Sequence, residues 1–175
     1  MAQYRRAHVP GAMWFFTVSL AERQGNHLLV QHIDELRQAF WYVREKHPSR
    51  TDAVVVLPDH LHCIRTLPAG DAEFSIRWKL LKGQFSRVIE NGERISQSRE
   101  KRRERGLWQR RFWNTCYEIR RISTNMSHIH WNPVKHGGVK QVAGWLYSSP
   151  QDYVARGVYS ANWGYDGGFD VCAGE

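Results

Sequence analysis

The chain has few residues of the kinds that mark disulfide-rich, zinc-bound or membrane-embedded proteins. Among its 175 residues are only three cysteines, Cys63, Cys116 and Cys172, with no Cys-x-x-Cys pair. An odd and widely spaced set argues against a disulfide framework or a zinc knuckle. The apolar run 12–20 is too short to span a bilayer, and no small-residue cleavage pattern follows it. We therefore expect a cytoplasmic protein with no membrane contact.

Acidic residues are also scarce relative to basic ones. There are 17 Asp and Glu against 25 Lys and Arg, which gives a net charge of +8, and the chain holds 8 Trp, 7 Tyr and 7 Phe. Lys and Arg neutralise phosphates and flat rings stack on bases, so this composition suits a nucleic-acid partner. Composition alone leaves a second interpretation open, in which the aromatic residues form the core and the charge only aids solubility.

Hydrophobic spacing predicts alternating strands and helices. Apolar and β-branched runs predict strands, apolar residues at helical spacing predict helices, and Pro58-Asp59 predicts a tight turn. In chain order we expect strand 13–20, helix 33–43, strands 53–57 and 60–67, helix 74–88 and strand 107–113. This order predicts a ferredoxin-like α+β sandwich, with an antiparallel sheet and helices packed on one face.

The domain organisation is expected to be simple. Residues 1–160 form one domain, and 161–175 form a Gly-rich tail. Within the domain, segment 91–106 is polar and charged, which favours a mobile basic loop. The segment 128–131 is predicted to be the last turn of a helix that Asn132-Pro133 stops, because the residue before a proline disfavours the α region.

Two histidines in the strand 60–67 are the strongest chemical signal. His60 and His62 are two residues apart, so in a strand both imidazoles project from the same face. Neutral imidazoles suit several divalent metals, with a third ligand supplied from elsewhere in the chain. The spacing also fits two ordinary polar residues on a half-exposed strand, and by itself it leaves both interpretations open.

Several separate segments together resemble a known family. They are Tyr4-Arg5-Arg6, 11–20, 54–68, 108–113 and the run Asn132-Pro133-Val134-Lys135-His136-Gly137. In this order they resemble the REP-associated tyrosine transposases, which are relatives of the single-tyrosine HUH transposases. The resemblance extends from about Tyr4 to about Trp163.

The resemblance implies a metal-dependent reaction on single-stranded DNA. By the family motif, His60 and His62 bind a divalent cation, Mg²⁺ or Mn²⁺, and Asn132 is the third ligand. The substrate class implied is the hairpin of a repetitive extragenic palindrome. The metal polarises the scissile phosphate, and a tyrosine attacks it to form a 5′-phosphotyrosine link.

The nucleophile departs from the family pattern. The family motif resembles Tyr-Ile-His-x-Asn-Pro, whereas this chain has His128-Ile129-His130-Trp131-Asn132-Pro133. His128 therefore occupies the catalytic position of the tyrosine. A phosphohistidine would be labile where the family needs a durable intermediate, so His128 is expected to be a further metal ligand or inert. Tyr117 lies upstream but does not match the motif.

A frameshift offers one explanation for this departure. If permitted codons for residues 116–127 are read one base earlier, they can spell leucine, leucine, arginine, aspartate, glutamine, threonine, aspartate, phenylalanine, asparagine, glutamine, histidine, valine. That string resembles the family's approach to its catalytic helix. A compensating change just before Ile129 would restore the frame and could turn tyrosine into histidine.

The first functional prediction is a transposase-family protein that binds DNA hairpins and cleaves them poorly or not at all. The alternatives are a non-catalytic DNA-binding regulator and a nuclease that activates water with His60, His62 and Asn132. A monomer is expected, and a dimer is possible. The predicted phosphate contacts are Arg5, Arg6, Lys79, Lys82, Arg110, Arg111 and Lys135.

Overall fold

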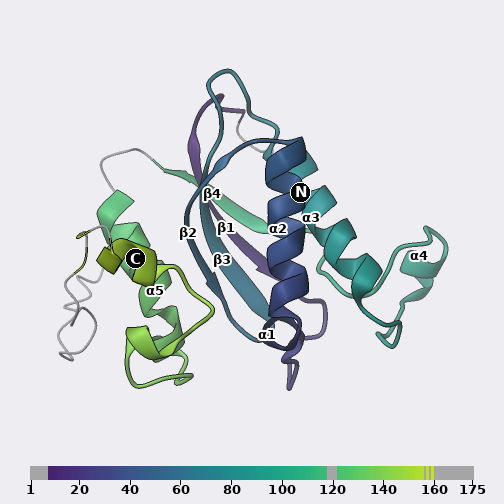
Figure 1. Cartoon of the computed structure of the whole chain (residues 1–175). Coiled ribbons are helices and arrows are strands. Elements are labelled where there is room, and N and C mark those ends of the chain that lie inside the picture. Colours follow the sequence, from purple (N-terminus) through teal and green to yellow (C-terminus); the bar gives the residue numbers. More distant parts are fainter. Residues whose placement is uncertain (1–7, 118–121, 156, 158, 160–175) are drawn as a thin grey trace, which may run out of the picture.

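The computed structural model, which describes residues 8–117, 122–155, 157 and 159, has one antiparallel sheet with helices on both faces (Figure 1). The sheet order is β2-β3-β1-β4, and the chain follows the β-α-β-β-α-β succession. The predicted α+β class with an antiparallel sheet is thus confirmed. The elements are β1 (Met13–Ser19), α1 (Leu28–Gln31), α2 (Ile33–Lys46), β2 (Arg50–Val56), β3 (His60–Thr66), α3 (Phe74–Val88), α4 (Gln97–Glu100), β4 (Trp113–Tyr117), α5 (Ile122–Lys135), η2 (Val142–Gly144) and α6 (Pro150–Ala155).

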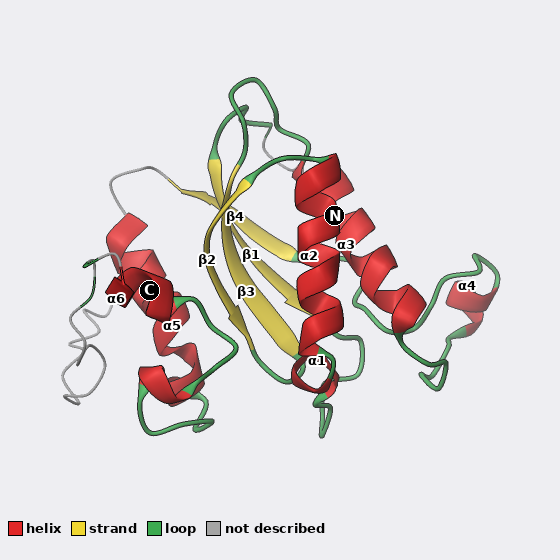
Figure 2. Ribbon diagram, in the orientation of Figure 1, coloured by secondary structure: helices red, strands yellow, loops and turns green. Residues whose placement is uncertain are grey.

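The two faces of the sheet carry different helices. Alternation along β1 sends Trp14, Phe16 and Val18 into the larger core, which α2 and α3 complete. The opposite face carries Met13, which packs with Ile129 of α5 in a smaller core. Figure 2 shows the sheet between these two groups of helices. The expectation that helices pack on one face therefore holds for α2 and α3 but not for α5.

The helix α3 contributes a buried charge to the larger core. The spacing of its residues places Arg77 among the basic residues outside the apolar stripe, yet the side chain is only 2% exposed. Its guanidinium donates to the carbonyls of His47, Pro48 and Glu73, and it pairs with the Asp71 carboxylate at 2.6 Å. Arg77 thus links the start of α3 to the connection between α2 and β2.

The helix α5 continues through Pro133, so the predicted stop at Asn132-Pro133 is wrong. A proline lacks the N–H that would donate to the carbonyl four residues back, here that of Ile129. The Asn132 side-chain nitrogen lies 3.4 Å from that carbonyl oxygen and donates at 2.9 Å to the carbonyl of His128. This side chain supplies donors where the proline has none, and the helix ends at Lys135.

The region before β4 also differs from expectation. The last strand begins at Trp113, whereas the sequence predicted it over 107–113. Leu107 and Trp108 are buried in the larger core, and Trp108 forms an isolated bridge with Leu20. These apolar residues therefore pack into the core ahead of the strand. The hydrophobic pattern alone does not distinguish such a buried loop segment from a strand.

The basic segment 91–106 contains α4 and is joined to its surroundings through arginines. Arg105 pairs with the carboxylate of Glu93 at 2.5 Å and donates to carbonyls at the end of α3 and just after it. Arg99 donates to the carbonyls of Arg105 and Trp108. The mobility of this segment stays a prediction, but Arg99 and Arg105 have partners within the protein.

The predicted boundaries of the domain lie near the end of the described chain. The helix α6 is the last described helix and ends at Ala155. The Gly-rich tail 161–175 lies outside the described residues, as do Arg5 and Arg6. No described helix has the length and apolar character needed to cross a membrane.

Candidate metal and DNA-binding site

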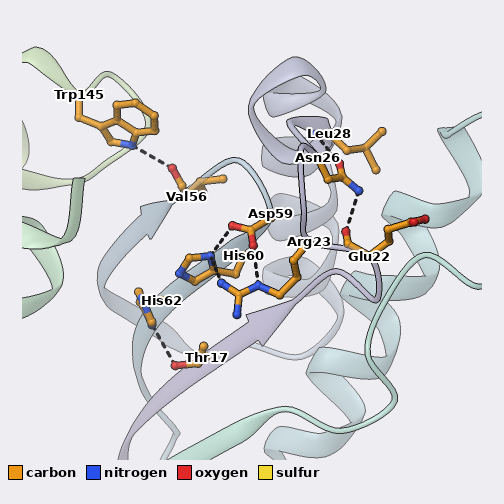
Figure 3. A network of polar contacts seen from close by, with 10 residues as sticks. All are labelled: Thr17, Glu22, Arg23, Asn26, Leu28, Val56, Asp59, His60, His62 and Trp145. Atoms are coloured by element: carbon orange, nitrogen blue, oxygen red, sulfur yellow. Dashed lines mark hydrogen bonds and ion pairs between the residues drawn. The ribbon is translucent and has the colours of Figure 1, made fainter. Parts of the chain in front are cut away.

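The histidine pair lies at the start of β3 on the face that α5 partly covers. The rings of His60 and His62 have centroids 5.0 Å apart and are nearly perpendicular. Figure 3 shows both rings beside the turn that joins β2 to β3. The predicted projection from one face is thus borne out by the geometry, and two imidazoles at this separation can share one ion.

A carboxylate orients the ring of His60. Nδ1 of His60 lies 2.6 Å from Oδ1 of Asp59, and Oδ2 of Asp59 accepts from Nε of Arg23 at 2.5 Å (Figure 3). A carboxylate only accepts hydrogen bonds, so Nδ1 carries the proton, although a nitrogen of Arg23 lies 3.2 Å away. Nε2 of His60 consequently keeps its lone pair for a metal, in the arrangement common to metal-bound histidines.

The ring of His62 is held by a hydroxyl and an aromatic ring. Its Nδ1 lies 2.9 Å from Oγ1 of Thr17, the residue of β1 that is paired with His62. The Thr17 hydroxyl can accept from Nδ1–H, and this tautomer leaves Nε2 free. The ring also stacks on Phe15 at a centroid distance of 5.5 Å.

Burial keeps both imidazoles in the form that binds metals. Burial lowers the pKa of His62 to about 3, and the nearby charge of His60 acts in the same direction. Burial also lowers the pKa of His60, although Asp59 opposes this effect. Burial alone would raise the pKa of Asp59, but hydrogen bonds from His60 and Arg23 bring it below its usual value. At neutral pH the site therefore presents two neutral imidazoles and an ionised Asp59.

A third imidazole lies near the pair, just after the end of α5. The ring of His136, one residue beyond α5, lies 5.8 Å from the ring of His60. Both border a cavity of about 330 Å³ that Arg23, Asn26, His27 and Asp59 also line. His136 belongs to the motif quoted above but was not predicted as a site residue, and Arg23, Thr17 and Asp59 were missed as partners of the pair. The adjacency of Asp59 to His60 was the one local signal available.

The predicted third ligand is turned toward its own helix. The contacts described for Asn132 are the bonds of its side-chain nitrogen to carbonyls of α5. Among the described residues, no three His, Cys, Asp or Glu side chains form a group that could hold a metal ion. The donor set thus fits two imidazole ligands, and the assignment of Asn132 stays a prediction.

The two other histidines of the α5 motif lie in different surroundings. His128, at the position of the family tyrosine, is exposed. His130 is fully buried, with its ring nitrogens 3.0 Å from the Tyr159 hydroxyl and 2.9 Å from that of Ser149. Burial lowers the pKa of His130 to about 4, which suits a neutral structural residue.

The predicted DNA contacts fall in separate places. Lys79, Lys82 and Arg110 line a groove of about 650 Å³ along α3. In that groove Lys82 donates to the carbonyl of Gln109, and Arg110 pairs with Glu104 at 2.7 Å. Exposed Arg111 precedes β4, and exposed Lys135 ends α5 beside His136. The structure therefore places Lys79, Lys82 and Arg110 together along α3, and only Lys135 stands next to a residue that borders the histidine site.

Comparison with known proteins identifies the family of the chain. No family profile matches it. It is 40% identical to the REP-associated tyrosine transposase of Escherichia coli (strain K12), covering all of this chain and 98% of that protein. It is 37% identical to a candidate REP-associated tyrosine transposase of Haemophilus influenzae (strain ATCC 51907 / DSM 11121 / KW20 / Rd), with 94% of each covered. Its fold matches a REP-associated tyrosine transposase solved bound to a REP hairpin, at a TM-score of 0.80 and 39% identity over all of this chain and 98% of that one. With its sheet, its histidine pair and this full-length similarity, the chain belongs to the REP-associated tyrosine transposases.

Proposed function

We propose that this protein binds single-stranded REP hairpin DNA and holds a divalent metal, Mg²⁺ or Mn²⁺, on His60 and His62. The observation that carries the metal assignment is the pair of neutral imidazoles, buried at His60 and half-buried at His62, whose Nδ1 atoms are engaged by Asp59 and Thr17. The hairpin assignment is supported by the similar transposase, which was solved bound to a REP hairpin.

The residues around the site have distinct tasks in this proposal. A metal bound there supplies Lewis-acid polarisation of a DNA phosphate. Asp59 keeps the ring of His60 oriented, and Arg23 neutralises the carboxylate that does so. Lys135 contributes positive charge at the end of α5 for the DNA backbone. Asn132 as a third ligand would require its amide to turn away from the helix carbonyls.

Strand cleavage through a protein–DNA bond is proposed to be impaired. His128 stands on α5 at the position of the family tyrosine, and its exposed ring offers no phenolic oxygen for a durable phosphoester. Part of the segment behind the frameshift hypothesis, residues 118–121, lies outside the described residues. Sequencing the gene tests that hypothesis, since codons incompatible with the alternative frame would rule it out.

One gel assay tests the proposed function. Labelled REP hairpin DNA with single-stranded flanks is incubated with the protein and Mn²⁺ or Mg²⁺, and then resolved under native and denaturing conditions. We expect a shifted band that weakens steeply with salt, and no covalent adduct. The variant His128→Tyr should restore an adduct, and adding His60→Ala to it should abolish the adduct.

A matched control is the placement of a tyrosine on a helix away from the site. In a protein that keeps His128, Glu45→Tyr puts the same phenol on an exposed position of α2, which packs against the other face of the sheet, and should give no adduct. An adduct formed by the unaltered protein would contradict the proposed impairment. Free cleavage products without an adduct would instead favour a water-activating nuclease, and a shift that is independent of metal in every variant would favour a DNA-binding regulator.

A further inference from the structure

The face of the sheet that carries the histidine pair is covered unevenly. Over β2 and part of β3, α5 buries Ala53, Val55 and Ile64 beneath Ile129. Toward β1 and β4, the described residues of this face are less buried, and Trp113 on β4 leaves 59% of its surface exposed. An exposed tryptophan on a half-open sheet face offers a large flat apolar surface to a partner.

The register of the strands aligns this tryptophan with the histidine site. Thr17 of β1 pairs with His62 on one side and with Trp113 on the other. Paired residues share a face, so these three side chains form a row across β3, β1 and β4. Phe15 joins the row two residues along β1, with its ring edge-on to Trp113 at 5.7 Å and stacked with His62 at 5.5 Å.

We infer that Trp113, supported by Phe15, forms a stacking platform for bases of single-stranded DNA next to the proposed metal site. The inference rests on the proposed function and adds the position of the unpaired strand. Bases of a duplex are stacked on one another, whereas an unpaired base has a free face for an aromatic ring. The row of rings leads from the edge strand β4 to the imidazoles. Exposed Arg111, just before β4, can contact the phosphate backbone of the single-stranded DNA whose base stacks on Trp113.

The chain contains a matched control for this platform. Trp41 on α2 has the same exposed fraction, 59%, but α2 packs against the other face of the sheet. Loss of either indole removes a similar exposed surface. Only the loss of Trp113 should affect DNA that lies across the histidine face.

The test uses two REP hairpins, one with single-stranded flanks that contain 2-aminopurine and one without flanks. For the flanked hairpin, Trp113→Ala should weaken binding about tenfold, which is within the range for one stacked base, and should relieve quenching of 2-aminopurine. Trp113→Phe should retain most of the quenching. The hairpin without flanks should bind all variants equally, and Trp41→Ala should match the unaltered protein on both probes.

Three results would overturn the inference. If Trp113→Ala binds the flanked hairpin as tightly as Trp41→Ala does, with the same quenching, the platform is wrong while the proposed function stands. If Trp113→Ala weakens both hairpins equally, the residue supports the hairpin and does not stack the flank. If the unaltered protein binds neither hairpin, the proposed function fails and the platform fails with it. Circular dichroism and thermal melting of each variant confirm that the comparison is made on folded protein.

Discussion

Replacing Asp59 with asparagine is the sharpest test of the metal site. Asp59 accepts from Nδ1 of His60 through one oxygen and from Arg23 through the other, at 2.6 and 2.5 Å. Asparagine has the same shape, but one of its two terminal atoms is a donor. The variant can therefore satisfy His60 or Arg23 but not both, and it loses the negative charge that strengthens both bonds.

The expected size of the effect follows from this role. Loss of a carboxylate that orients a metal-bound histidine typically weakens metal affinity about 10- to 100-fold, or about 1.4 to 2.8 kcal/mol. Isothermal titration of Mn²⁺ into DNA-free Asp59→Asn at pH 7 measures this change directly. His60→Ala should lose more, because it removes a ligand and not only its support.

An exposed aspartate provides the control. Asp34→Asn breaks an i,i+3 pair with Arg37 on α2 whose partners are 77% and 60% exposed, so metal affinity should not change. Equal Mn²⁺ affinities for Asp59→Asn and the unaltered protein would refute the reasoning, provided that His60→Ala abolishes binding. If His60→Ala also binds Mn²⁺ normally, the ion lies elsewhere.

Two further predictions concern stability. Arg77→Met should lower the free energy of unfolding by about 3–5 kcal/mol in urea titrations, because it removes a buried guanidinium from three carbonyls and takes the cation from Asp71, which keeps only the backbone N–H of Glu73. Arg37→Met should change it by less than about 0.5 kcal/mol. A small loss for Arg77→Met would contradict the buried role. His130, with a folded pKa of about 4 and an unfolded value near 6.5, is protonated more readily in the unfolded chain, so its contribution is complete above pH 6.5 and is lost as the pH falls to 4. Stability should therefore fall by about 3 kcal/mol more over this interval in the unaltered protein than in His130→Gln, and identical pH profiles would rule this out.

Much of the fold could be predicted from local patterns. The strand beginning at Met13, the strand beginning at His60 and the helix 74–88 begin and end within a residue or two of expectation. Their periodicity is strong because one face of each packs against a core. The prediction of the last strand was wrong at its start, because the apolar residues Leu107 and Trp108 pack into the core ahead of β4 and are not part of the strand.

The helix α5 shows how a side chain can override a local rule. Asn132-Pro133 predicted a stop, since proline removes a donor and restricts its predecessor. In the structure the Asn132 amide supplies donors to two helix carbonyls, so the helix continues to Lys135. The same contact is why the assignment of Asn132 as a metal ligand needs its own test.

The sequence by itself determined the identity and spacing of the two imidazoles, because strand alternation is a local property that places His60 and His62 on one face. It also determined the family, through separate segments in the correct order. Only the tertiary structure decided what surrounds the pair. Arg23 is 36 residues from Asp59, Thr17 is 45 residues from His62, and β4 brings Trp113 beside Thr17. Such contacts depend on the register of paired strands and on the paths of the loops between them. A local stretch of sequence on its own specifies neither the register nor the loop path.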